Sequence, residues 1–116
     1  MHEMALMGDI LNIIIEDANK KGIKQFHQVE LMVGELSNAM PDALRMAFTI
    51  YKEQNPHIFS EDASLHIQYE EAISECIFCQ TRYKPDLKIS ICPSCNMPSG
   101  KLISGETFQV LSYEGE

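Results

Sequence analysis

Two Cys-x-x-Cys pairs, Cys76-Ile77-Phe78-Cys79 and Cys92-Pro93-Ser94-Cys95, are separated by 12 residues and decide how this chain is organised. Two residues between paired cysteines let a tight turn aim both sulfurs at one ion. Two such knuckles supply the four thiolates that tetrahedral zinc accepts, and four protein ligands leave no open position for water. The spacing therefore predicts a structural zinc site, whose ligands are Cys76, Cys79, Cys92 and Cys95.

Other chemistries of four cysteines remain to be compared with zinc. Disulfides are disfavoured because Met1-His2-Glu3 places an acid where a secretory signal has positive charge, so we expect a reducing, cytoplasmic location. A thioredoxin-like motif has one pair opening a helix, not two pairs in a ribbon. Iron with a redox role fits the same tetrahedral set by geometry, and visible absorption distinguishes it from zinc.

Composition and charge restrict the class of protein. A chain of 116 residues that is 45% hydrophobic and 22% charged predicts one main domain with at most a small appendage. Nine basic and 17 acidic residues give a charge of −8, which repels phosphate backbones. The apolar runs, such as residues 4–7 and 13–15, are too short to span a bilayer. We therefore expect a soluble protein with neither a nucleic-acid nor a membrane partner.

Two amphipathic helices are predicted from the spacing of apolar residues. The first covers residues 4–18 and ends before Gly22, which suits a left-handed helix cap. The second begins at Pro41, a residue favoured at the first helical position, and ends at residues 55–56, Asn-Pro. The apolar face of the second helix consists of Leu44, Ala47, Phe48 and Tyr51.

Alternating apolar residues predict three strands, at residues 29–33, 65–69 and 108–113. Two helices on one face of a small three-stranded sheet give an α+β fold. The cysteine segment lies before the last strand, so we expect a zinc-ribbon-like domain of residues 74–103 inserted into a main domain of residues 1–73 plus 104–116. Near-alternate residues between the knuckles are expected to form a short ribbon: Tyr83, Ile89 and Ile91.

The amino-terminal Met1-His2-Glu3 offers a distinctive set of metal ligands. A histidine in position two can present the terminal amine, its own deprotonated amide and an imidazole nitrogen to one ion through adjacent chelate rings. Three coplanar nitrogens suit Ni(II) or Cu(II), with the Glu3 carboxylate or another side chain as fourth ligand. By residue chemistry alone, the commoner interpretation is a solvated helix start. The other histidines lack paired spacing and are expected to be structural or solvated: His27, His57 and His66.

The initial Met1-His2-Glu3, the element Gly34-Glu35-Leu36-Ser37 and the paired knuckles together resemble the HypA/HybF family, nickel metallochaperones of [NiFe]-hydrogenase maturation. The similarity covers essentially the whole chain. It implies that Ni(2+) is carried by Met1, His2 and Glu3 in the main domain, and that Zn(2+) in the cysteine site is structural. The implied partners are a HypB-type GTPase and the hydrogenase large-subunit precursor, and some relatives also serve urease. Monomer and homodimer both remain open.

One position departs from the pattern of this family. Some relatives have an aspartate ligand a few residues after the glycine-glutamate element, and a gapless count places Met40 there. Asp42 is the nearest substitute, so the fourth nickel ligand stays open.

A second class of function competes with nickel carriage. The zinc knuckles alone are also typical of a zinc-ribbon module that docks protein or nucleic acid without carrying nickel. The charge of −8 disfavours the nucleic-acid version. An enzyme is not expected, because the sequence has no P-loop, nucleophile elbow or His-Glu-x-x-His motif.

Overall fold

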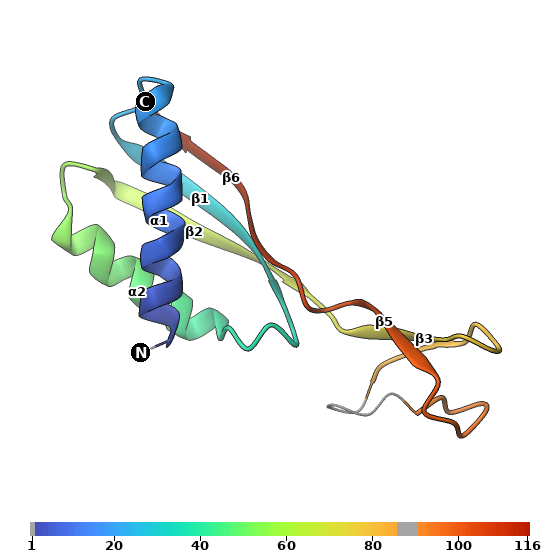
Figure 1. Ribbon diagram of the computed structural model, residues 1–116. Helices are drawn as coiled ribbons and strands as arrows, with labels where there is room; N and C mark the ends of the chain where they lie inside the picture. The colour runs from blue at the N-terminus through green and yellow to red at the C-terminus, as the bar shows by residue number, and fades with distance from the viewer. Residues whose placement is uncertain (1, 86–90) are drawn as a thin grey trace.

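The computed structural model describes residues 2–85 and 91–116. A large sheet has the strand order β2-β1-β6, in which β1 runs parallel to β2 and antiparallel to β6. A smaller sheet has the order β4-β3-β5 (Figure 1). The elements in chain order are α1 (His2–Lys20), β1 (Phe26–Gly34), α2 (Pro41–Gln54), β2 (Phe59–Glu70), β3 (Ile73–Cys76), β4 (Arg82–Tyr83), β5 (Gly100–Ser104) and β6 (Phe108–Gly115).

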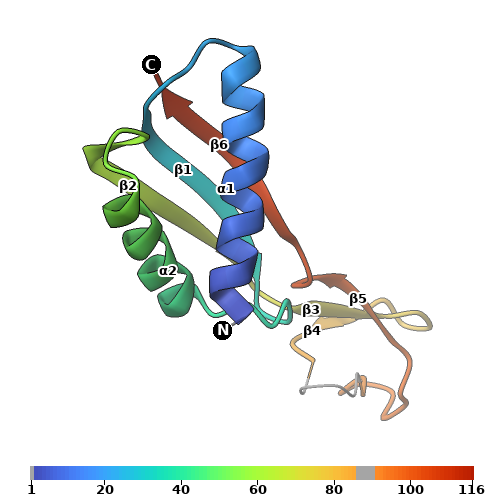
Figure 2. The same ribbon diagram turned by 60° about the vertical axis from the view of Figure 1, so that its left-hand side comes forward.

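Both helices cover the same face of the large sheet (Figures 1 and 2). Helix α1 stops where Gly22 adopts a φ of 76°, a conformation that glycine reaches without steric cost. Helix α2 starts with Pro41 in its first turn, as predicted. The Tyr51 hydroxyl of α2 donates a hydrogen bond of 3.0 Å to the Met4 carbonyl of α1, so the two helices are joined directly as well as through the sheet.

The core lies between these helices and the central strand β1. Val29, Leu31 and Val33 alternate along β1 and are completely buried, because their side chains face the helices. The helices contribute their apolar stripes to the same cluster, which confirms the predicted α+β fold of two helices on a three-stranded sheet. The buried residues of the helices are Met7, Ile10, Leu11, Ile14, Ala18, Leu44, Ala47 and Phe48.

Strand β2 begins earlier than the sequence pattern indicates. It starts at Phe59, which is buried against Phe26 of β1 with ring centroids 5.7 Å apart. The exposed Glu61 and Asp62 interrupt the alternation, and the β1–β2 register shifts at the same place. A β-bulge of this kind hides the start of a strand from a simple period-two pattern.

The small sheet differs from the predicted ribbon. Tyr83 lies in β4, but Ile91 is outside any strand, so the prediction for Ile91 is wrong; Ile89 lies outside the described residues. The reason is that β3 pairs with β4, which follows the first knuckle, and with β5, which follows the second knuckle. The chain enters this small sheet after β2 and returns before β6, and a separate domain of residues 74–103 stays a prediction.

The molecule is elongated, with extents of 56 × 27 × 19 Å, because the small sheet projects from one end of the large one (Figure 1). The start of α1 lies at the end of the main domain that faces the small sheet, in both views (Figures 1 and 2). Within residues 2–85 and 91–116, neither helix has the length and apolar character needed to cross a membrane.

Candidate metal centres

The two Cys-x-x-Cys pairs form the same backbone turn twice. In the first knuckle the Gln80 amide donates to the Cys76 carbonyl at 3.0 Å, and in the second the Asn96 amide donates to the Cys92 carbonyl at 2.8 Å. Gln80 and Asn96 both adopt a left-handed conformation, with φ of 59° and 57°. Each turn directs its two sulfurs to one side, as the spacing predicts.

The structure brings the four cysteine sulfurs together into one cluster. All four lie within 4.8 Å of one another, with Cys79 and Cys92 3.6 Å apart and Cys76 and Cys95 4.0 Å apart. A tetrahedron of thiolates around an ion at about 2.3 Å has edges of about 3.8 Å. The four cysteines are free thiols. The donor set and its spacing therefore fit a four-cysteine metal site of the size that zinc requires.

Hydrogen bonds to individual sulfurs separate their acidities. The Ser99 hydroxyl, 3.1 Å from the Cys76 sulfur, lowers the pKa of that thiol to about 6, and two backbone amides add to the effect. A hydrogen bond with Thr81 lowers the pKa of Cys79. The pKa of Cys95 rises to about 12, chiefly through its hydrogen bond with Cys79. Cys76 and Cys95 therefore do not ionise together unless a cation offsets their charge.

Ser99 and Thr81 are site residues that the sequence did not reveal. Ser99 is buried beside Cys76, although 22 other positions separate the two along the chain. No spacing rule identifies such a partner, because the second knuckle must fold back before the two residues meet.

The second candidate site is the start of α1. Met1 lies outside the described residues, and the helix begins at His2, whose side chain is exposed. The first four amide groups of any helix have no partner within it. The backbone nitrogen of His2 is therefore not committed to the helix and remains available to a metal ion.

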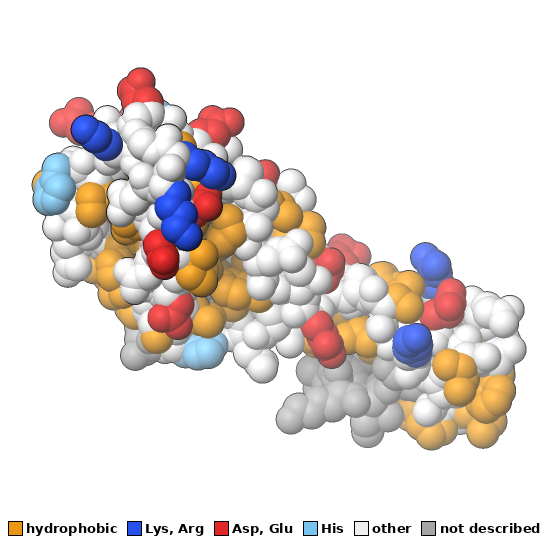
Figure 3. Space-filling view, turned by 45° about the horizontal axis from the view of Figure 1, so that its top comes forward, with side chains coloured by type: hydrophobic (Ala, Val, Ile, Leu, Met, Phe, Trp, Pro, Cys, Tyr) orange, Lys and Arg blue, Asp and Glu red, His pale blue; other side chains and the backbone are white. Residues whose placement is uncertain are grey.

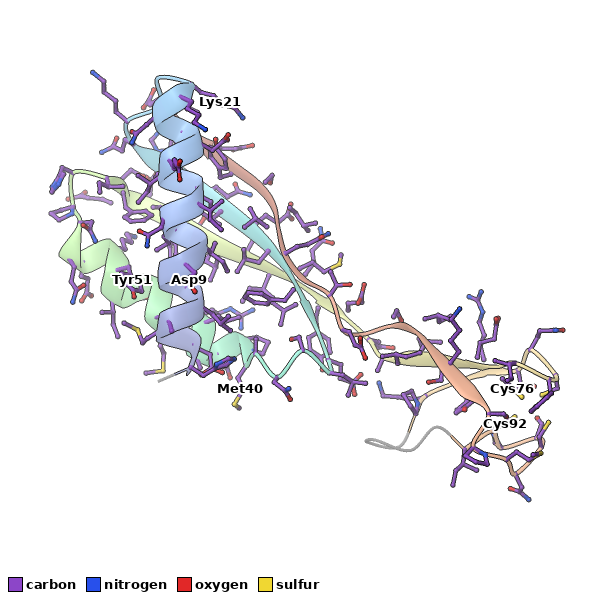
Figure 4. All side chains as sticks on the ribbon, viewed as in Figure 1. Asp9, Lys21, Met40, Tyr51, Cys76 and Cys92 are labelled. Atoms are coloured by element: carbon purple, nitrogen blue, oxygen red, sulfur yellow. The ribbon has the colours of Figure 1, made fainter. Side chains whose placement is uncertain are left out.

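Glu3 has a different environment from that of His2. It is buried, and its carboxylate accepts a hydrogen bond of 3.4 Å from the backbone amide of Met40. Met40 is the N-cap residue of α2 and makes no capping bond with its own side chain, so Glu3 places negative charge at the positive end of α2. Figure 4 shows Met40 beside the start of α1. The carboxylate therefore joins the first turns of both helices.

Asp42, the sequence-based substitute for a fourth nickel ligand, faces another partner. Its exposed carboxylate is 3.1 Å from Arg45 on the same helix. The remaining histidines behave as expected. His27 contacts Ser60 and Glu116, His66 contacts Ser64, and His57 is exposed. Among the residues that the structure describes, only the cysteines form a metal-sized group of three or more ligands.

The element Gly34-Glu35-Leu36-Ser37 connects the large sheet to the small sheet that carries the cysteines. The Glu35 carboxylate accepts a hydrogen bond of 3.0 Å from the Ala72 amide and forms an ion pair with Lys84, and these contacts lower the pKa of Glu35, the Lys84 hydrogen bond most strongly. The Leu36 amide donates to the Gly105 carbonyl at 2.7 Å. This element therefore holds both segments that connect the large sheet to the small sheet.

Comparison with known proteins assigns the chain to a family. A family model described as "Hydrogenase/urease nickel incorporation, metallochaperone, hypA" matches residues 1–115. The chain belongs to the HypA family. It is 35% identical over 116 residues to the hydrogenase maturation factor HypA of Moorella thermoacetica, with 100% of both chains covered. It is 37% identical over 99 residues to HypA of Lawsonia intracellularis, covering 82% of this chain and 81% of that one.

Solved HypA structures share the architecture described above. The solution structure of a HypA protein matches with a TM-score of 0.67 and 26% identity, covering 100% of this chain and 97% of that one. The solution structure of the Ni metallochaperone HypA from Helicobacter pylori has the same fold, with a TM-score of 0.63, 24% identity, and coverage of 97% and 96%. The family predicted from the sequence is confirmed, and it is a family of maturation factors and metallochaperones.

Proposed function

We propose that this chain binds Ni(II) at Met1, His2 and Glu3 and delivers it during maturation of [NiFe]-hydrogenase, and that urease is a second client class. The observation that carries the proposal is the exposed His2 at the first position of a helix, in a chain of the HypA family. The activity is carriage and release of an ion, without catalysis.

Ligation by backbone nitrogen suits this position. Within a helix, removing an amide proton destroys a hydrogen bond, but the amide of His2 precedes the first bonded turn. The terminal amine, this amide nitrogen and the imidazole provide three donors in one plane, which Ni(II) accepts. An ionised amide also adds negative charge where the helix dipole alone repels a cation.

Glu3 completes the proposed set in a shared role. One carboxylate oxygen faces the Met40 amide, and the second oxygen is the donor available to nickel. Its negative charge offsets the positive ends of both α1 and α2, so we expect Glu3 to aid nickel binding through charge even where direct ligation is weak.

We assign zinc to the four cysteines and give it a structural role. The thiolates close the coordination sphere, which leaves no position for substrate. The described part of residues 74–103 buries few large apolar side chains, so metal ligation is the main source of its stability. Free thiols in such a site are consistent with a reducing cytoplasm.

The proposed partners are a HypB-type GTPase as nickel source and the hydrogenase large-subunit precursor as acceptor. The runner-up function is a zinc-ribbon interaction module that carries no nickel. The observation that favours nickel carriage over this alternative is again the N-terminal tripeptide, which a docking module does not need.

Calorimetric titration of Ni(II) at fixed zinc content tests the proposal. The variants are His2→Ala, a form with one extra N-terminal residue, and His57→Ala as the matched control, because His57 is an exposed histidine far from the terminus in sequence. The extension converts the amine into an amide and displaces the histidine, so it should weaken nickel as much as His2→Ala does, by about tenfold or more. Affinity should also fall in acid, because protons compete for the same nitrogens. Equal affinity of the extended and native forms would refute terminal chelation, and absence of nickel binding would favour the docking module.

A further inference from the structure

The two knuckles expose four large apolar side chains at the far end of the zinc module. Ile77 and Phe78, between the first pair of cysteines, are 61% and 64% exposed. Ile91 and Met97, on either side of the second pair, are 51% and 50% exposed. We call these four residues the knuckle patch. Figure 3 shows hydrophobic side chains gathered at this end of the molecule.

The two loops that carry the four residues of the knuckle patch lie side by side. The cysteine sulfurs of both knuckles lie within 4.8 Å of one another, which places the two loops side by side. Ser99 also bridges them, because its carbonyl accepts from the Ile77 amide at 3.1 Å and its own amide donates to the Met97 carbonyl at 2.8 Å. The two loops that carry the apolar side chains are therefore held together.

Zinc ligation does not explain these apolar residues. The two positions between paired cysteines shape a turn, and polar residues satisfy that need equally well. Four large side chains at this exposure present roughly 400–500 Å² of apolar surface, a size at which patches on monomers are often functional. Met97 and Phe78 suit the binding of apolar segments of varied shape, because methionine is flexible and phenylalanine offers a large contact area.

The size of the patch and the charge of the zinc module around it indicate the occupant of the patch. A stable complex buries about 800 Å² on each partner, so the knuckle patch is too small for a lasting dimer of this chain and fits a short-lived complex. Residues 74–103 contain four basic and two acidic residues, whereas the rest of the chain contains five basic and fifteen acidic ones. An acidic partner is therefore repelled by the main domain and not by the zinc module.

We propose that the knuckle patch binds an apolar segment that the enzyme precursor exposes before it receives nickel and buries once it is loaded. This inference rests on the proposed function. A precursor that is not yet fully folded presents apolar segments, and burial of the segment on maturation provides release. The start of α1 lies at the end of the main domain facing the zinc module, whereas the knuckles lie at the far end of that module (Figures 1 and 2).

The test measures binding of the zinc-loaded chain to the nickel-free large-subunit precursor of the same organism, and to its mature, nickel-loaded form, by biolayer interferometry. The variant Ile77→Ser/Phe78→Ser removes half of the patch. The matched control is Ile13→Ser, because Ile13 is 67% exposed on α1 in the main domain. A second variant, Met97→Ser, changes the other knuckle in case the double variant fails to hold zinc.

We expect the double variant to bind the precursor at least about tenfold more weakly, since truncating the anchors of a small interface removes much of its affinity. Met97→Ser should lose a smaller factor, Ile13→Ser none, and the mature subunit should bind the unaltered chain poorly. Full precursor binding by zinc-loaded variants, equal loss in Ile13→Ser, or no binding by the unaltered chain would overturn the inference. A monomer–dimer shift in the double variant, seen by sedimentation, would instead identify a second copy as the occupant and also overturn it. Nickel titration of the same variants separates the two proposals. Failure of the chain to chelate nickel at its terminus refutes only the proposed function.

Discussion

Gly34→Ala should destabilise the junction between the large sheet and the small sheet. A Cβ atom at Gly34 would lie 2.3 Å from the Gly105 carbonyl oxygen, 2.5 Å from the Gly105 carbonyl carbon and 2.9 Å from the Glu106 nitrogen. All three atoms belong to the backbone, so no side chain can rotate to make room. The backbone segments around Gly34 and Gly105 must move apart instead.

The cost of that separation follows from the contacts it strains. Overpacking of a closely packed site costs about 1–3 kcal/mol. The Gly34 amide donates to the Thr107 carbonyl at 2.6 Å and the Leu36 amide donates to the Gly105 carbonyl at 2.7 Å, and each weakened bond adds about 0.5–1 kcal/mol. We therefore expect a loss of about 3 kcal/mol in the free energy of unfolding. With an m-value of about 1.5–2 kcal/mol/M, the urea midpoint should fall by about 1.5–2 M.

Urea denaturation followed by far-ultraviolet circular dichroism measures this shift, with zinc content held constant. Gly22→Ala is the matched control, since a Cβ there meets nothing within 4 Å and only its φ of 76° opposes the change. That control should cost about 1 kcal/mol. If Gly34→Ala lowers the midpoint no more than Gly22→Ala does, the close approach to Gly105 is not what requires glycine.

Three further outcomes are expected. The Cys79→Ser/Cys92→Ser double variant should lose its zinc. Its helical circular dichroism should persist, because α1 and α2 pack against β1. Retention of full zinc, or collapse of the helical signal, would contradict this prediction. Lys84→Ala should raise the pKa of Glu35 toward its ordinary value of 4.5, as followed by carboxyl-carbon NMR. Because the pKa of Glu35 is lowered in the folded protein, its carboxylate contributes stability above the unfolded pKa, and this stability is lost as the pH falls through the folded pKa. The Lys84→Ala variant should therefore be less sensitive to acid below pH 4.5. An unchanged Glu35 titration in this variant would exclude the ion pair as the cause of the lowered pKa. Asp42→Asn should leave the calorimetric nickel affinity unchanged, since Arg45 already pairs with that carboxylate, and a loss as large as that of His2→Ala would make Asp42 a ligand.

The parts of the structure that the sequence predicted are those set by local rules. The knuckle turns follow from the two residues between paired cysteines. Gln80 and Asn96, one after each pair, adopt the same left-handed backbone conformation. Helix α2 follows from Pro41 and from apolar residues at a period of 3.6, which present one face to the core whatever the rest of the chain does. Such features need no knowledge of distant segments.

Contacts between distant segments account for what the sequence did not predict. The early start of β2 depends on Phe59 meeting Phe26, 33 positions away, across a bulge that breaks the alternation. The element from Gly34 to Ser37 resembled a family motif, but its physical role emerges only when Ala72, Lys84 and Gly105 converge on it. A list of residue types contains no information on that convergence.

Glu3 shows how such a distant contact changes the chemistry expected of a site. The sequence presents it as a free carboxylate beside His2, but the structure places one of its oxygens on the Met40 amide at the start of α2. In the proposed site, nickel would therefore share Glu3 with the junction of the two helices. A carboxylate with two partners binds the ion less tightly than a free one, and weaker binding favours transfer. In the proposed site, this shared carboxylate is the acidic side chain next to His2 in sequence, so release of nickel would depend on the packing of α1 on α2.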